Sequence, residues 1–280
     1  MTRPMQRRAF ASLVAGALGA GLALLASCQG SGSEPAPAAA RETQLVVFAA
    51  TSLRDAFTAM VAVFEKAHPG VRVTLNFAGT QEIRTQLEQG AVADVFASAD
   101  ERHMKALQDA NRVEQPEIFA ENEAVLVVSS ERAESVRSLA DLPSAARIVL
   151  GAPEVPIGRY ALQILDRASA KGGADFRARV EARVVSRELN VRQVLAKVSL
   201  GEADAGIVYR SDVASAGTQY AVVTIPADVN VIARYPIAQV KAGRSPSLGR
   251  EWVTLVGSEQ GRAILRGCGF MAPPRAQATP

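Results

Sequence analysis

Hydrophobic and polar positions alternate between two periods along residues 44–270 of the 280-residue chain. Residues 44–49 form a short apolar run typical of a buried strand, whereas in 53–67 apolar residues recur every three or four positions. That second spacing predicts an amphipathic helix, which Pro69 ends. Residues 71–77 then alternate one by one, as a strand does. The succession of strand and helix predicts a parallel sheet covered by helices on both faces.

The same succession continues to the end of the chain. Further strands are expected at 93–99, 124–129, 147–153, 184–185, 206–209, 221–226 and 235–240. Further helices are expected at 80–90, 101–110, 158–171 and 190–201, and around Trp252 and Ile264. Because the pattern begins again after residue 124, two α/β units of similar build fit better than one large sheet.

The N-terminus has a different composition. Residues 1–27 carry Arg3, Arg7 and Arg8, then an apolar run, and no acidic residue, which predicts a signal peptide. The run ends in Leu-Ala-Ser before Cys28, which resembles a bacterial lipobox, so Cys28 is the expected lipidation site. A transmembrane anchor is the alternative, but the run is shorter than the ~20 residues of a comfortable span. The arginine pair also resembles a twin-arginine export signal, and the choice between this route and Sec stays open.

The segments that flank the predicted fold are polar and flexible in composition. Residues 28–43 are rich in Gly, Ser, Pro and Ala and predict a tether, and 272–280 predict a disordered tail. The chain has 31 basic and 28 acidic residues, and removal of the three arginines of the signal peptide leaves 28 of each. The balanced charge offers no electrostatic footprint for nucleic acid. Cys268 then has no disulfide partner, and we expect a small buried thiol.

The sequence lacks the motifs of common enzymes. It has two histidines, His68 and His103, the second on a helix expected to be exposed. It has no Gly-x-Ser-x-Gly, His-Glu-x-x-His, Walker or dinucleotide motif. These absences favour a binding protein over an enzyme. A lipoprotein hydrolase that uses Ser52 stays an alternative, although the sequence supplies no base for it.

Uncharged residues stand where the predicted strands end and the next helices begin. They are Thr51-Ser52, Gly79-Thr80, Ile157-Gly158 and Asn190-Val191. Helix N-termini carry unpaired N–H groups and a positive dipole end, so several of them at one sheet edge can bind an anion without Lys or Arg. Ordinary helix capping by Ser, Thr or Asn is the better explanation of each position when it is taken alone.

Four ordered segments resemble the molybdate-binding proteins that serve ABC transporters. They are VFAATSL (47–53), the run from Asn76 to Met104, PEVPIGRYA (153–161) and the run from Asn190 to Asp212, followed by YPIA (235–238) and GCGF (267–270). The resemblance implies a bilobed periplasmic-binding-protein fold of type II, with two doubly wound α/β lobes joined by two crossover strands. The crossovers are expected near 124–128 and 235–240. The first lobe would comprise 44–124 and 236–271, and the second 125–235.

The resemblance also implies which residues bind a tetrahedral oxyanion. Ser52 and Thr80 match positions that supply hydroxyl groups from the first lobe. Ile157 and Val191 match backbone N–H donors of the second lobe, and Tyr209 matches a phenol that reaches the oxyanion. The metal would be bound only as part of the oxyanion, with no protein atom bonded to molybdenum.

Two local departures from the family pattern affect this site. The Gly79-Thr80-Gln81 segment has fewer hydroxyl groups than the commoner serine run, and the N–H of Gly79 is a candidate helper. Ile157 is bulky for its position, and the nearby Arg159 either touches the anion or faces solvent.

The expected function is capture of molybdate, and of tungstate, for the permease and ATPase subunits of an ABC importer. The signal peptide and the lipobox predict an exported protein, held by the lipid on Cys28 to the extracytoplasmic face of a bacterial membrane. This location is the periplasm if the cell is Gram-negative, and the kind of envelope and the membrane that holds the anchor stay open. We expect a monomer without cofactor or nucleic-acid partner. A different oxyanion, such as sulfate, is the alternative ligand.

The mature protein should sediment with membranes after cell lysis, because the acyl chains on Cys28 insert into the bilayer. Fractionation followed by immunoblotting measures this. A mature form in the soluble fraction would contradict lipidation and leave the binding site unaffected.

Overall fold

The computed structural model describes residues 43–214 and 219–273. The predicted signal peptide (1–27), the predicted lipidation site Cys28 and all of the predicted tether but Thr43 lie outside the described residues, as do positions 274–280 of the predicted tail. Within the described ranges, no helix combines the length and the apolarity that a membrane crossing requires.

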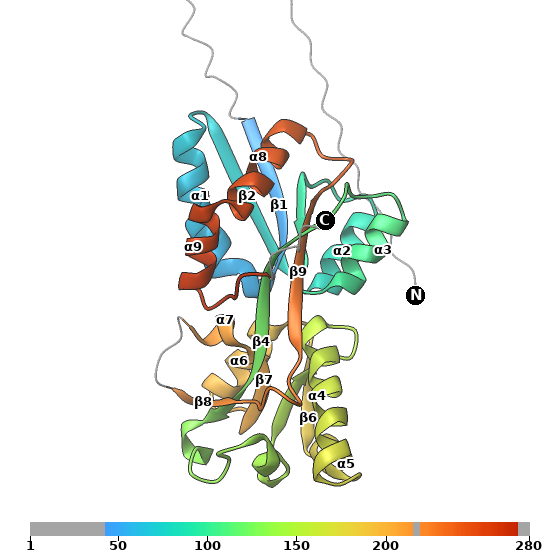
Figure 1. Cartoon of the computed structure of the whole chain (residues 1–280), viewed down its shortest axis with the longest axis vertical. Helices are drawn as coiled ribbons and strands as arrows, with labels where there is room; N and C mark the ends of the chain where they lie inside the picture. The colour runs from blue at the N-terminus through green and yellow to red at the C-terminus, as the bar shows by residue number, and fades with distance from the viewer. Residues whose placement is uncertain (1–42, 215–218, 274–280) are drawn as a thin grey trace, which may run out of the picture. The chain divides into compact units, whose positions relative to one another are not determined.

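The first lobe contains three parallel strands, and Figure 1 shows helices packed around them. The strands are β1 (Thr43–Ala50), β2 (Val71–Ala78) and β3 (Val95–Ala97), in the order β2-β1-β3. The helices are the 3₁₀ turn η1 (Thr51–Leu53), α1 (Arg54–Ala67), α2 (Thr80–Glu88), α3 (Glu101–Asp109), α8 (Pro246–Gly257) and α9 (Glu259–Gly267). Because β1 and β2 are adjacent and parallel, α1 and α2 follow them at the same edge of the sheet. The turns before both helices therefore lie at that edge.

The second lobe repeats this build. Its strands are β5 (Ile148–Gly151), β6 (Val184–Glu188), β7 (Ala205–Tyr209) and β8 (Tyr220–Thr224). Its helices are α4 (Pro156–Gly172), α5 (Phe176–Glu181), α6 (Val191–Ser199) and α7 (Arg210–Val213), with 3₁₀ turns η2 (Ser130–Arg132) and η3 (Leu139–Ser144). The strands β5, β6 and β7 are parallel to one another. The strand β8 does not pair with them and instead pairs antiparallel with β4 (Glu117–Ser129).

Two long antiparallel strands, β4 and β9 (Ile232–Gln239), connect the lobes. Residues 117–123 of β4 pair with β9, whereas 124–128 pair with β7 in the second lobe. At its other end β9 pairs with β3 of the first lobe. The predicted crossovers therefore fall on the right strands, but the first passes between the lobes just before residue 124. Pairing of Glu121 with Met271 also ties the end of the described chain to β4.

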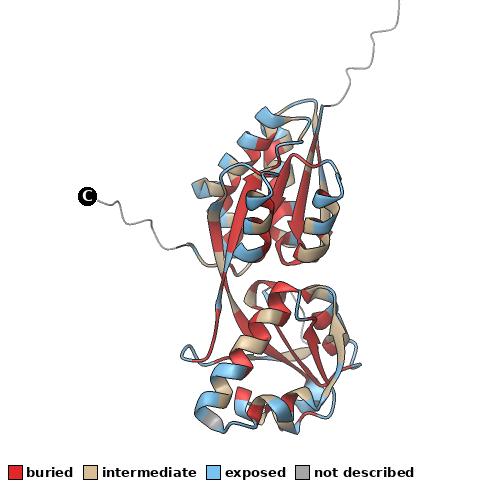
Figure 2. Cartoon of the chain, turned by 90° about the vertical axis from the view of Figure 1, so that its right-hand side faces the viewer, coloured by how far each residue is buried: buried red, intermediate tan, exposed pale blue. Residues whose placement is uncertain are grey.

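The apolar positions of the strands are buried between the helices in both lobes (Figure 2). The largest fully buried side chain is Trp252, which packs edge-on against Phe57 and Phe64 and so joins α8 to α1. The bilobed α/β fold predicted from the sequence is confirmed. The sheets are mixed rather than purely parallel, because β9 and β4 enter them antiparallel.

Local differences have physical causes. His103 was expected to be exposed, yet it is 2% exposed because α3 packs its N-terminal turn against residue 154 of the second lobe. A 3₁₀ turn precedes α1, and the Ser52 hydroxyl pairs with the phenol of Tyr235. Cys268 is a free thiol, as expected, but only half-buried.

Candidate functional site

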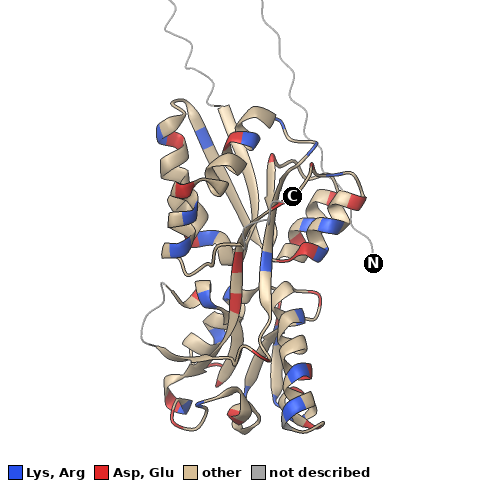
Figure 3. Cartoon of the chain, in the orientation of Figure 1, with Lys and Arg blue, Asp and Glu red and all other residues tan. Residues whose placement is uncertain are grey.

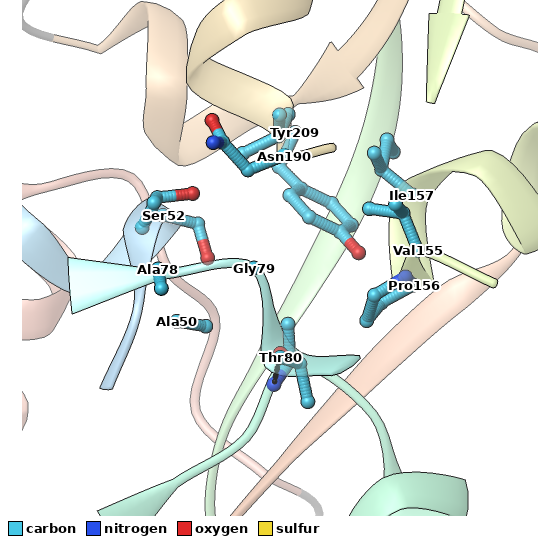
Figure 4. Close-up of a pocket in the computed structure, with 13 residues that line it drawn as sticks. Ala50, Ser52, Ala78, Gly79, Thr80, Val155, Pro156, Ile157, Asn190 and Tyr209 are labelled. Carbon is cyan, nitrogen blue, oxygen red and sulfur yellow. Dashed lines mark hydrogen bonds between the residues drawn. The ribbon is translucent and has the colours of Figure 1, made fainter. Parts of the chain in front are cut away.

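A small cavity lies between the two lobes, at the sheet edge where the helices begin (Figure 4). Its lining combines turns from both lobes: Ala50, Thr51, Ser52, Ala78, Gly79, Thr80, Ala99, Val155, Pro156, Ile157, Asn190, Val191 and Tyr209. All five principal site residues predicted from the sequence are in this set. Segments separated by more than 150 positions in the chain thus meet in one place.

The first lobe contributes two buried hydroxyl groups. Ser52 follows β1 and is 2% exposed, and Thr80 opens α2 after β2 and is 1% exposed. Because β1 and β2 are adjacent and parallel, their carboxyl ends bring these residues together. The backbone N–H of Ala99 donates to Thr80 Oγ1 at 3.2 Å, so the hydroxyl hydrogen of Thr80 is free to bind a ligand.

The second lobe contributes the first turns of two helices. Pro156 occupies the first position of α4, where its missing N–H costs nothing, and Ile157 follows it. Val191 opens α6 after the N-cap Asn190, whose side chain accepts from the N–H of Gln193. N–H groups in a first helical turn have no intrahelical acceptor. Those of Ile157 and Val191 bond to nothing else in the described part of the chain, and both residues line the cavity.

Tyr209 ends β7, and its phenol points into the cavity in Figure 4. The side chain is 1% exposed, and its hydroxyl has no hydrogen-bond partner among the described residues. Burial raises the pKa of Tyr209 well above its ordinary value, so the phenol stays protonated. A buried O–H without an acceptor costs about 1–3 kcal/mol, which a ligand that accepts the bond removes.

The cavity lining has no charged side chain. In the view of Figure 3, residues of both charges occur in both lobes. The cavity has a volume of about 10 Å³, close to the least space that holds one water molecule. Its uncharged lining with hydroxyl and N–H donors suits a compact ligand that accepts hydrogen bonds.

The two additional residues proposed from the sequence are placed differently. Gly79 lines the cavity, but its N–H donates to Glu82 Oε2 at 2.9 Å, so that donor is already used. Arg159 is absent from the lining and pairs with the fully buried Asp100 at 3.2 Å. This carboxylate belongs to the N-cap of α3, and it draws Arg159 toward the first lobe rather than toward the cavity or solvent.

Polar contacts between the lobes surround the cavity. Gln81 Nε2 donates to the carbonyl of Leu189 at 2.7 Å. His103 Nε2 lies 3.0 Å from the carbonyl of Glu154, and Arg102 donates to the same oxygen at 3.2 Å. Burial lowers the pKa of His103, so the ring is neutral and donates to this carbonyl. These contacts hold the lobes in a closed arrangement.

A second interlobe ion pair centres on Arg192, in the first turn of α6. Its guanidinium lies 2.7 Å from Asp55 of the first lobe and 2.9 Å from Asp212 of the second. Asp212 is fully buried, and its other oxygen accepts from the N–H of Tyr209 at 3.2 Å. Burial raises the pKa of Asp212 to about 7, against the opposing effect of Arg192.

The Ser52 hydroxyl and the side chain of His68 have separate partners in the described ranges. Ser52 Oγ pairs with the phenol of Tyr235 at 3.0 Å, not with an imidazole or carboxylate. His68, at the C-terminal end of α1, pairs with Glu251 on α8. No group of three or more His, Cys, Asp or Glu side chains in the described part of the chain is arranged to hold a metal ion.

Sequence reasoning missed the buried polar residues behind the cavity. Asn122 on β4 and Tyr235 on β9 are both fully buried and bond to each other, and Tyr235 also bonds to Ser52. Asn122 stands between Glu121 and Glu123, so the local pattern did not set it apart as a buried residue. Tyr235 lay within a predicted strand and crossover, but no role was assigned to its phenol.

A two-lobed α/β fold that encloses a small polar cleft between its lobes is the architecture of a type II periplasmic solute-binding protein. Two solved structures share it. They are the periplasmic molybdate-binding protein of Azotobacter vinelandii (TM-score 0.71, 20% identity, 82% of this chain and 99% of that one) and the sulfate-binding protein SubI of Mycobacterium tuberculosis (TM-score 0.75, 17% identity, 83% and 88%). At these identities the likeness establishes the fold.

Sequence comparison identifies the family. A family model described as bacterial extracellular solute-binding protein matches residues 45–271. The molybdate-binding protein ModA of Mycobacterium tuberculosis H37Rv is 39% identical over 263 residues, 93% of this chain and 97% of that protein. A Bacillus subtilis protein named as a candidate ABC transporter substrate-binding lipoprotein, YvgL, is 30% identical over 252 residues, 89% and 94%. The chain belongs to the bacterial extracellular solute-binding proteins, among the ModA-like members.

The pH dependence of stability should report on Asp212. Its pKa in the fold, about 7, is above its ordinary value of 3.8. The folded state therefore holds a proton that the unfolded state loses, and the free energy of unfolding falls as pH rises between these values. The limit is about 1.4 kcal/mol per pH unit for one proton. Urea unfolding from pH 4 to 8 should show this fall in wild type and not in Asp212→Asn.

The difference between the two curves isolates Asp212 from other titrating groups. Parallel curves would contradict the raised pKa. A wild type that gains stability relative to the variant with rising pH would instead identify Asp212 as an ordinary ion-paired carboxylate.

Proposed function

We propose that this protein binds molybdate, and tungstate with similar affinity, in the cavity between its lobes and delivers it to an ABC importer. The observation that carries the proposal is a buried cavity lined by hydroxyl and backbone N–H donors with no charged side chain. The name of the 39% identical ModA relative supports molybdate as the ligand. The transporter's permease and ATPase subunits are the proposed partners.

The donors come from Ser52, Thr80 and Tyr209 through their hydroxyl groups, and from Ile157 and Val191 through their backbone. Charge-assisted hydrogen bonds of this kind contribute about 1.5–3 kcal/mol each. The positive ends of α4 and α6 add to the attraction for an anion. No protein atom would bond to molybdenum, and no cofactor is proposed.

The chemistry of the donors selects among tetrahedral anions. Molybdate and tungstate carry no proton at neutral pH, so every oxygen can accept. Hydrogen phosphate carries a proton that finds no acceptor in such a cavity, at a cost of about 1–3 kcal/mol. Sulfate lacks the proton but is smaller, so some donors of a site sized for molybdate lie beyond its reach. Molybdate and tungstate are nearly equal in size and should bind alike.

Closure of the lobes follows from the division of the donors. Neither lobe alone surrounds the ligand, so the anion stabilises the closed form by the difference in its affinity for the two states. The transporter would recognise the closed form. The lipid on Cys28 would keep a monomeric binding protein close to the membrane, and the name of the Bacillus subtilis relative supports this anchoring.

Thermal unfolding with molybdate, tungstate, sulfate and phosphate in parallel tests the ligand. Molybdate and tungstate at about 100 times their dissociation constant should each add ~2.7 kcal/mol to the free energy of unfolding, and phosphate should add nothing. Circular dichroism measures the shift in Tm. A shift with sulfate alone would overturn the molybdate assignment.

Tyr209→Phe serves as the site control for this measurement. The variant removes one donor and keeps the ring, which packs edge-on against Tyr160 and Tyr235. Loss of one charge-assisted bond should weaken molybdate binding about 10- to 100-fold. Equal affinities of variant and wild type would remove Tyr209 from the proposed site.

Gly79→Ala should block closure without unfolding the protein. The backbone of Gly79 (φ −60°, ψ 140°) accommodates alanine. An added Cβ, however, would lie 2.4 Å from the carbonyl oxygen of Leu189 in the other lobe. The lobes must then stop short of closure, and molybdate affinity should fall at least ~10-fold, equivalent to about 1.4 kcal/mol. Titration calorimetry measures the affinity.

Gly257→Ala provides the matched control, because an added Cβ there has no atom within 4 Å. Both variants should unfold within about 0.5 kcal/mol of wild type without ligand. Undiminished affinity of Gly79→Ala for molybdate would show that the closed contact between Gly79 and Leu189 does not accompany binding.

A further inference from the structure

A buried chain of hydrogen bonds leads from the crossover strands to the cavity. Asn122 Nδ2 donates to Tyr235 Oη at 3.4 Å and to Ser211 Oγ at 2.8 Å, and Tyr235 Oη lies 3.0 Å from Ser52 Oγ. We propose that Asn122 and Tyr235 are positioning residues that make the Ser52 hydroxyl an obligate donor to the ligand, so that they determine the preference for unprotonated oxyanions. This inference rests on the proposed oxyanion-binding function of the same cavity.

The direction of the chain follows from the number of hydrogens at each atom. The amide nitrogen of Asn122 can only donate, so Tyr235 Oη accepts from it. The single hydrogen of Tyr235 then has Ser52 Oγ as its acceptor, since no other partner of this phenol is found in the described part of the chain. If Ser52 donated to Tyr235 instead, the phenol hydrogen would be buried without an acceptor.

The consequence at the cavity is that the Ser52 hydroxyl has a fixed role as hydrogen-bond donor. Ser52 accepts from Tyr235 and therefore keeps its own hydrogen for the cavity that it lines. Thr80 is constrained in the same way by the backbone N–H of Ala99, which can only donate. The unpartnered phenol of Tyr209 completes a set of three hydroxyl groups whose hydrogens face the ligand. An anion with a proton of its own leaves either that proton or one of these hydroxyl hydrogens without an acceptor.

The orientation of the Asn122 amide determines which atom donates in each of these hydrogen bonds. With the amide turned around, its oxygen would accept from Tyr235, and Ser52 would spend its hydrogen on the phenol. In the observed orientation Asn122 Oδ1 lacks a partner among the described residues. The reverse orientation would leave the amide hydrogens buried without acceptors, and buried unpaired N–H groups are rarer than undersatisfied oxygens.

The packing around the chain holds its atoms in place. The ring of Tyr235 lies edge-on to Phe270 and Phe119, with centroids 5.3 and 6.3 Å away. Both Asn122 and Tyr235 are fully buried, and they lie on β4 and β9, the two strands that belong to both lobes. Burial also raises the pKa of Tyr235, so the phenol keeps its hydrogen.

The test compares the affinities for molybdate and for hydrogen phosphate by titration calorimetry. In Tyr235→Phe, Ser52 can rotate and offer a lone pair to a protonated anion. The ratio of phosphate to molybdate dissociation constants should fall at least 10-fold, with less than a 10-fold loss for molybdate. Asn122→Asp replaces the donor by an acceptor of the same shape and should lower the ratio in the same direction. Tyr220→Phe, which removes a phenol without a described partner, should leave both affinities unchanged.

The outcomes separate the two proposals. If wild type binds sulfate and not molybdate, the proposed ligand is wrong, and the same comparison with sulfate as the unprotonated anion still tests the chain. An unchanged ratio, or an equal loss for both anions, would overturn the positioning role. Failure of both variants to fold, judged by circular dichroism, would show that these hydrogen bonds only stabilise the fold. That result would also overturn the positioning role.

Discussion

Buried hydrogen-bond donors that lack an acceptor within the protein are the constraint on which this structure depends. Ser52, Thr80 and Tyr209 direct hydroxyl groups to one small cavity, and the first turns of α4 and α6 line it with unpaired backbone N–H groups. Each unmet donor costs about 1–3 kcal/mol in a closed site. The closed arrangement is therefore favourable only around a ligand that accepts all of these bonds, and this requirement links closure to ligand chemistry.

The crossover strands give the two lobes a fixed relation at one side of the cavity. β4 and β9 pair with each other and extend into both sheets, so the lobes can separate only by bending around these strands. Asn122 and Tyr235 lie in the paired segment, directly behind Ser52. One set of hydrogen bonds thus belongs to the connection between the lobes and also to the wall of the cavity.

Much of the fold could be predicted from local patterns in the sequence, whereas the individual site residues followed from the family resemblance. Period-two and period-3.6 spacing located the strands and long helices, and the uncharged residues at helix starts marked the turns that line the cavity. Short elements such as α5 and α7 were missed because too few residues define a period. The burial of His103 and the partners of Ser52 and Arg159 depend on contacts between segments 50 or more positions apart, which local spacing does not encode.

The arginines near the cavity are paired with acidic residues, so they are not available to bind an anion there. Arg159 and Arg192 lie in the first turns of α4 and α6, whose N-terminal residues line the cavity. Both are thus near enough to the cavity for their side chains to reach an anion there. Arg159 is paired with the buried Asp100, and Arg192 with Asp55 and Asp212. Each arginine thus pairs with an acidic residue of the first lobe, and Arg192 also pairs with one of its own lobe. A free cation would attract any anion, whatever its protonation, whereas neutral directed donors distinguish anions by which oxygens can accept. The ion pairs hold the lobes together and leave selection to the hydroxyl and N–H groups.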